Sequence, residues 1–163
     1  MAKSLQEFLK ESCKNNVLVI NSNVALDVYY LAPCDCSDLI RDSFLLLATK
    51  EKEQFSFSTF NSESTCLRKF ESTLIQLANH PQTFLAYCKK FAFRLKKERV
   101  NHEIVMKLFD CFNNTLIKLK NDDKLPHVRL LKDIAVSYKE TMEASDEFPH
   151  ELFSELDSLK NMN

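Results

Sequence analysis

Apolar residues recur every three or four positions throughout the second half of the chain. This spacing places the apolar side chains on one face of a helix. A polar capping residue or a proline stands at the start of each such segment. We therefore predict helices that begin near Ser62, Pro81, Asn101, Pro126 and Pro149. Nine residues on their apolar faces are predicted to form the core: Phe70, Leu74, Phe84, Phe91, Leu108, Phe109, Phe112, Ile134 and Tyr138.

The pattern over the first 60 residues is less regular. The sequence Ser-Leu-Gln-Glu at residues 4–7 resembles a capping box and predicts a helix to about residue 13. The apolar run at residues 17–20 is a buried connector or a short strand. Beyond it, Ser22 or Asn23 can start a helix that Pro33 stops. Ser37 can cap the helix that follows.

Residues 52–62 alternate between phenylalanine and small polar side chains. Phe55, Phe57 and Phe60 stand among serine and threonine, which is typical of an edge strand or of an extended loop anchored by aromatic rings.

The chain contains no glycine, whereas average usage is about 7%. Glycine supplies the positive φ of tight hairpin turns and allows close backbone approach to phosphates. Its absence excludes a P-loop and a dinucleotide-binding fingerprint, and it disfavours most compact β folds. We therefore predict an all-α fold, with residues 1–163 forming a single helical domain of seven to eight helices that pack as a bundle or as repeats.

Composition is that of a globular protein, with 163 residues, 45% of them hydrophobic and 28% charged, and a formal net charge of −1. The start of the chain does not resemble a signal peptide, and no apolar run is long enough to span a membrane. We expect an intracellular protein, cytoplasmic or nuclear, whose six cysteines are thiols.

Enzyme motifs do not emerge from the sequence. Cys34 and Cys36 form a Cys-Asp-Cys pair, but a zinc site needs further ligands at ordered spacing. The pair is therefore interpreted as part of a surface loop. The four histidines are scattered along the chain, and no catalytic or metal-binding residues are predicted.

Charge is distributed unevenly along the chain. Residues 89–99 hold six basic residues and one acidic residue, whereas residues 140–157 hold seven acidic residues and no Lys or Arg. Lys90, Arg94 and Lys97 fall on one helix face, which we predict to bind a partner. The predicted acidic contacts are Glu143, Asp146, Glu147, Glu151 and Glu155.

Two other interpretations of the basic stretch remain open. It can be a solvated helix face, the usual role of such a run. It can also bind nucleic acid, although bases stack on exposed aromatic rings and only Phe93 lies off the apolar face.

Residues 64–144 resemble the second half of a globin. The resemblance lies in "FLAYCKKFAFRLKKERVNHEIVMKLFDCFNNTL", followed by "LPHVRLLKDIAVSYKETMEA". It implies a globin-like packing of helices around a heme. With Val100 as the anchor, the iron-ligand position falls on Leu95 or Arg94, and the distal position falls near Cys66. Leucine has no lone pair and arginine stays protonated, so the resemblance implies a degenerate globin without heme.

The sequence therefore favours a non-enzymatic helical interaction or regulatory protein that binds another protein through polar helix faces or a groove. No cofactor is predicted, with heme possible but disfavoured. The alternative is a globin-type protein that binds a small ligand or heme. Nucleic-acid binding through residues 89–99 comes third, and membrane binding is not expected.

Overall fold

The computed structural model describes residues 2–12, 16–22, 25–48, 55–97 and 103–131. These residues form five helices and one two-stranded sheet: α1 (Ala2–Ser12), β1 (Val17–Asn21), β2 (Leu26–Tyr30), α2 (Ser37–Leu47), α3 (Glu63–Ala78), α4 (Pro81–Lys97) and α5 (Glu103–Asn121). Residues 128–131 add a further helical turn.

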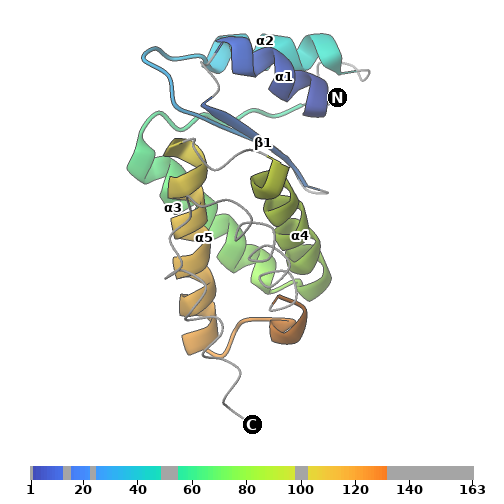
Figure 1. Ribbon diagram of the computed structural model, residues 1–163, viewed down its shortest axis with the longest axis vertical. Coiled ribbons are helices and arrows are strands. Elements are labelled where there is room, and N and C mark those ends of the chain that lie inside the picture. Colours follow the sequence, from blue (N-terminus) through green and yellow to red (C-terminus); the bar gives the residue numbers. More distant parts are fainter. Residues whose placement is uncertain (1, 13–15, 23–24, 49–54, 98–102, 132–163) are drawn as a thin grey trace.

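The sheet lies between two layers of helices, as Figure 1 shows. Helices α1 and α2 cover one face, and α3, α4 and α5 cover the other. Strands β1 and β2 are antiparallel, with Leu18 opposite Tyr29 and Val19 opposite Val28. The small sheet therefore separates two apolar clusters.

Strand β1 is buried on both faces because its side chains alternate between those clusters. Leu18 and Ile20 point into the cluster formed with α3, α4 and α5. Val17 and Val19 point into the cluster formed with α1 and α2. A strand covered on both sides has a continuous apolar run instead of an alternating one. This confirms the short-strand alternative for residues 17–20.

The helix predicted from Ser22 or Asn23 to Pro33 is wrong, because residues 26–30 form β2. Val28 and its two tyrosine neighbours belong to the residue types that favour strands. Ser22 and Ala25 join the ends of the two strands: the Ser22 N–H donates to the Ala25 carbonyl, and the Ser22 hydroxyl accepts from the Ala25 N–H, each at 2.9 Å.

The prediction of a purely all-α fold is therefore wrong. The described residues are mostly helical with a small sheet, and they form five helices and a further turn, fewer than the seven to eight helices predicted for the whole chain. The inference from the absence of glycine that the chain has no hairpin is wrong. A non-glycine residue also makes the left-handed turn that ends α5, where Asp123 has a φ of 59°. The Lys124 N–H donates to the Leu119 carbonyl there, which completes a Schellman cap.

Helix starts in the second half agree with the sequence where the structure describes them. Ser62 caps α3 by accepting from the Thr65 N–H at 3.3 Å, and Pro81 is the first residue of α4. Residues 55–61 have no regular structure, so the extended-loop alternative holds there. Phe55 packs edge-on against Phe44 of α2, with ring centroids 4.9 Å apart. Asn101 and the helices predicted beyond residue 131 lie outside the described residues.

The predicted core is confirmed for every member that the structure describes. Seven of the nine residues are buried in the cluster that α3, α4 and α5 form with the sheet: Phe70, Leu74, Phe84, Phe91, Leu108, Phe109 and Phe112. Three of the rings are in contact in series, with centroids 5.3 Å apart for Phe70 and Phe91 and 4.8 Å apart for Phe91 and Phe112. Ile134 and Tyr138 lie outside the described residues.

Candidate functional site

The surface of α4 that faces away from the core is basic and carries one exposed aromatic ring. Phe84, Cys88 and Phe91 recur on the buried side of the helix and have no exposed area. A residue two positions from Phe91 lies on nearly the opposite side, since each residue turns the helix by about 100°. Phe93 is accordingly 63% exposed.

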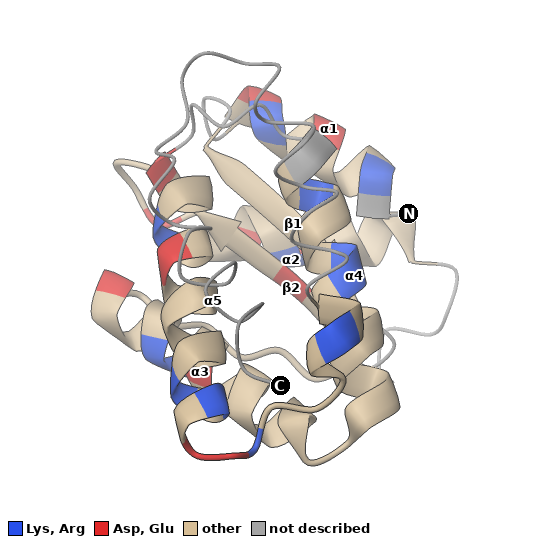
Figure 2. Cartoon of the chain, turned by 60° about the horizontal axis from the view of Figure 1, so that its bottom comes forward, with Lys and Arg blue, Asp and Glu red and all other residues tan. Residues whose placement is uncertain are grey.

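Basic residues surround that ring. Lys89 precedes Phe93 by one turn and is exposed, and Lys90 and Arg94 are half-buried beside it. Figure 2 shows the basic residues of α4 as blue bands. We call Lys89, Lys90, Phe93 and Arg94 the basic face.

Two of the three basic residues predicted to bind a partner therefore lie on this face. Lys97 is the last residue of α4, and its side chain is outside the description. The predicted acidic contacts Glu143, Asp146, Glu147, Glu151 and Glu155 also lie outside the described residues.

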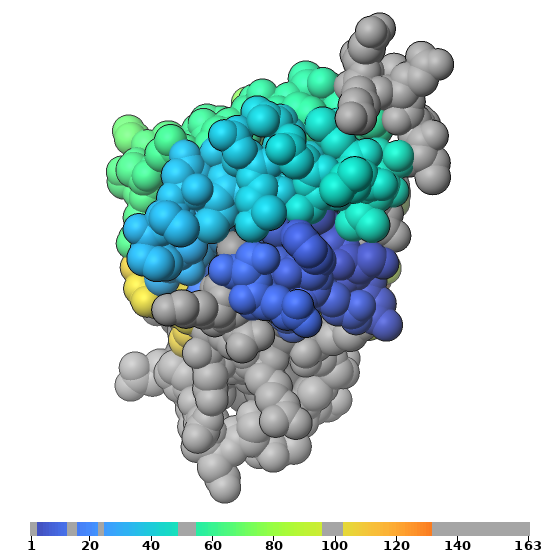
Figure 3. Space-filling view, turned by 90° about the horizontal axis from the view of Figure 1, so that it is seen from above, coloured from blue at the N-terminus to red at the C-terminus, as the bar shows by residue number. Residues whose placement is uncertain are grey.

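The α1–α2 layer, which lies on the other side of the sheet from α4, exposes apolar side chains as well. Figure 3 shows this surface, formed by α1 and α2. Phe8 and Leu39 are exposed there, and Leu46 is 84% exposed. The charges nearby have both signs, since Arg41 pairs with Asp38 at 3.0 Å. This surface therefore carries both signs of charge, whereas the four residues of the basic face include three cations and no carboxylate.

A group of buried polar side chains lies where β2 meets α3 and α4, and the sequence did not indicate it. Burial raises the pKa of Asp27, and the positive charge of Lys69 opposes that rise. Burial also raises the pKa values of Tyr29 and Tyr87, so both phenols stay neutral. The hydroxyl of Tyr87 is buried beside the side chains of Asp27 and Tyr29, which also affect its pKa. Asp27 and Tyr29 share one side of β2 because they are two residues apart, which the helical interpretation of this segment obscured.

The turn between β2 and α2 brings Cys34 and Cys36 together. Their sulfur atoms are 4.0 Å apart, and the thiol of Cys36 donates to the carbonyl of Cys34 at 3.5 Å. Cys34 is exposed and Cys36 is buried. Within the described ranges, no three His, Cys, Asp or Glu residues are close enough to hold a metal ion together.

The positions that the globin resemblance assigns to heme lie in different environments. Leu95 is buried in the core and only 2% exposed. Arg94 is half-buried on α4, and Cys66 of α3 donates to the Phe60 carbonyl at 3.0 Å. These residues lie on the helices that were expected to pack around the ligand.

Comparisons of this chain with known families, with curated proteins and with solved structures found no match. The globin resemblance therefore stays a hypothesis. A search of the helices in the described segments for one long and apolar enough to cross a membrane found none.

Proposed function

We propose that this chain is a non-enzymatic interaction protein that binds an acidic partner protein through the basic face of α4. The observation that carries the proposal is the exposure of Phe93 among Lys89, Lys90 and Arg94. A phenylalanine ring that is 63% exposed costs the isolated protein solvation free energy. A partner that covers the ring recovers this free energy.

The two components of the face have different roles in binding. Burying a phenylalanine side chain contributes about 1.5–3 kcal/mol, which is enough for one anchor of an interface. The surrounding cations attract an acidic partner over several ångströms and select its sign of charge. The expected partner segment therefore combines carboxylates with at least one apolar side chain.

A protein partner suits this surface better than a nucleic acid. Proteins that bind single-stranded nucleic acid use several exposed aromatic rings and a broad positive groove, whereas the basic face has a single ring. The formal net charge of the whole chain is −1, which weakens any general attraction for phosphate.

The chemistry of the buried polar groups supports a role without catalysis. Tyr29 and Tyr87 are neutral phenols held between sheet and helices. Burial raises the pKa of the Cys88 thiol to about 12, so it is not a nucleophile near neutral pH. These groups are suited to a structural role.

Binding of labelled probes by fluorescence anisotropy tests the proposal. The probes are a synthetic peptide of alternating glutamate and leucine residues and a single-stranded thymidine oligonucleotide. We expect the peptide to bind and its affinity to fall as salt increases. Phe93→Ala should weaken this binding by roughly tenfold to a hundredfold, the equivalent of losing one buried ring. Reversing Lys90, Arg94 and Lys97 to glutamate should abolish it.

Leu46→Ala is the matched control, because it removes an exposed apolar side chain from α2, which lies on the other side of the sheet from α4. It should leave peptide binding unchanged. Tighter binding of the oligonucleotide, lost in the triple reversal, would establish the nucleic-acid function instead. If wild type and Phe93→Ala bind the peptide equally well, the basic face is not the binding site.

A further inference from the structure

The turn before α2 holds two thiols in a fixed relationship. Cys34 lies on the surface, and Cys36 has only 7% of its area exposed and belongs to the cluster between the sheet, α1 and α2. Their sulfur atoms are 4.0 Å apart. The exposed thiol can meet a reagent in solution, while its neighbour is shielded and within reach.

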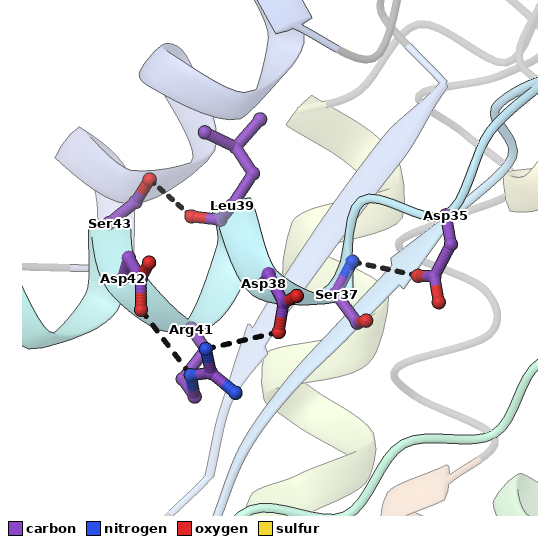
Figure 4. Close-up of polar contacts among 7 residues, drawn as sticks. All are labelled: Asp35, Ser37, Asp38, Leu39, Arg41, Asp42 and Ser43. Carbon is purple, nitrogen blue, oxygen red and sulfur yellow. Dashed lines mark hydrogen bonds and ion pairs between the residues drawn. The ribbon is translucent and has the colours of Figure 1, made fainter.

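Asp35, the residue between the two cysteines, is held in place by polar contacts. Its Oδ1 accepts from the Ser37 N–H at 2.8 Å, as Figure 4 shows, and from the Tyr30 hydroxyl at 2.9 Å. The Tyr30 oxygen in turn accepts from the Cys36 N–H at 3.3 Å. These bonds connect the end of β2 to the start of α2 and fix the backbone around Cys36. The proximity of the thiols is therefore built into the turn.

The other described thiols are in unreactive environments. Cys66 and Cys111 donate to the carbonyls of Phe60 and Leu67, and burial raises the pKa of both. Cys88 is fully buried in the helical core. Reaction of a cysteine requires the thiolate and access to it, which these positions limit. Cys34 is the exposed cysteine among those that the structure describes.

We propose that Cys34 and Cys36 form a reversible redox pair that exchanges with a low-molecular-weight disulfide such as oxidised glutathione. Deprotonated Cys34 attacks one sulfur of the reagent, which breaks its S–S bond, forms a mixed disulfide and releases one thiolate. The Cys36 thiolate then attacks the Cys34 sulfur and expels the second thiolate. The two released thiolates take up the two protons lost by the cysteines. The protein dithiol is oxidised by two electrons, and the reagent disulfide is reduced to two thiols.

The geometry makes the second step intramolecular. A disulfide bond is about 2.05 Å long, so the sulfur atoms must approach by roughly 2 Å from their separation in the reduced turn. Side-chain rotation at both cysteines provides that movement, since residues 31–36 are outside helices and strands. A disulfide that bridges residues two positions apart stores strain, and strained disulfides are readily reduced. The pair therefore suits a reversible switch.

Oxidation would also change the packing of the layer that α1 and α2 form on the sheet. The sulfur of Cys36 lies in the cluster that includes Leu5, Leu9 and Phe44. Moving it toward Cys34 withdraws it from that cluster at the first residues of α2. The redox state of the pair thus acts on the α1–α2 surface.

Peptide mapping of the full chain after incubation with oxidised glutathione tests the proposal. Trypsin releases residues 15–41 as one peptide, which contains Cys34 and Cys36 and no other cysteine. We expect this peptide to lose two hydrogens in mass and to resist alkylation. Excess reduced glutathione should restore both properties.

Single variants test the order of attack. Cys36→Ser should accumulate glutathione on Cys34, because the resolving thiol is missing. Cys34→Ser should leave Cys36 unmodified, because that thiol is buried. Cys66→Ser is the control and should form the same disulfide as the wild type. The proposal is overturned if both cysteines of the 15–41 peptide remain alkylatable in wild type. It is equally overturned if Cys34 of the wild type is recovered only in disulfides with glutathione or with cysteines other than Cys36.

Discussion

Tyr29 of β2 packs edge-on against Phe70 of α3, with ring centroids 5.7 Å apart and planes at 86°. The contact joins the sheet to the helical core, since Phe70 also lies 5.3 Å from the ring of Phe91 in α4. Edge-to-face pairs are favourable because the positive edge of one ring meets the negative face of the other. The strand that carries Tyr29 is thus part of the same packed unit as the helices.

Two phenylalanines on α4 provide a matched test of this core. Phe91 is fully buried and Phe93 is 63% exposed, although they are two residues apart. Phe91→Ala should lower the free energy of unfolding by about 3–5 kcal/mol, as should truncation of Phe109 or Phe112. Phe93→Ala should change it by no more than about 0.5 kcal/mol. Urea denaturation measures both, and equal losses at the two positions would contradict the orientation of α4.

The hairpin can be checked independently by NMR. Val19 and Val28 lie opposite each other in the antiparallel pair. We expect nuclear Overhauser contacts between their backbone protons, because opposed residues in such a sheet are about 4.5–5.5 Å apart at Cα. Contacts between residues three positions apart within 26–30 would instead indicate the helix that the sequence suggested.

Asp27 and Asp35 should affect stability in opposite directions. Burial raises the pKa of Asp27 above its ordinary value of 3.8. The folded protein therefore holds this proton more tightly than the unfolded chain, and stability falls as pH rises from about 3.8 through the folded-state pKa. Asp27→Asn removes this loss of stability at higher pH, because the amide carries no ionisable proton. We expect the variant to have a higher Tm than wild type near pH 7 and a similar Tm near about pH 3.

Asp35 is the opposite case. The hydrogen bond from the Ser37 N–H lowers its pKa, with a further contribution from the Tyr30 hydroxyl. Its stabilising effect is present above 3.8 and is lost as pH falls through the folded-state pKa. Asp35→Ala should therefore lower Tm near pH 7, and this difference should shrink in acid. Thermal melts that shift in the same direction for both variants near neutral pH would contradict these assignments.

The globin resemblance leads to a spectroscopic prediction. Leu95 is buried in the core and cannot ligate iron, and Arg94 stays protonated. Protein purified from heme-supplemented cells should show no Soret band. A stable band that disappears on substitution of the exposed His80 would support the globin-type function and identify that histidine as the ligand.

The sequence by itself determined the helices from Ser62 to Asn121 and the described part of the core. Their apolar residues follow the helical period, and Ser62 and Pro81 supply local start signals that need no distant partner. The basic face could also be anticipated, since Lys90 and Arg94 fall beside the apolar stripe and share one side of the helix. Local sequence patterns are sufficient to predict a helix that has one buried face and one solvent-exposed face.

The tertiary structure alone decided the role of residues 17–30. A strand covered by helices on both faces loses its alternating pattern, and a short apolar segment can then be strand or helix. Burial of Asp27 and Tyr87 at one interface likewise depends on elements that are far apart in sequence. The 4.0 Å approach of Cys34 and Cys36 depends on bonds between Tyr30, Asp35 and Ser37 that link a strand to a helix. Such contacts form only when the chain folds, so no local pattern records them.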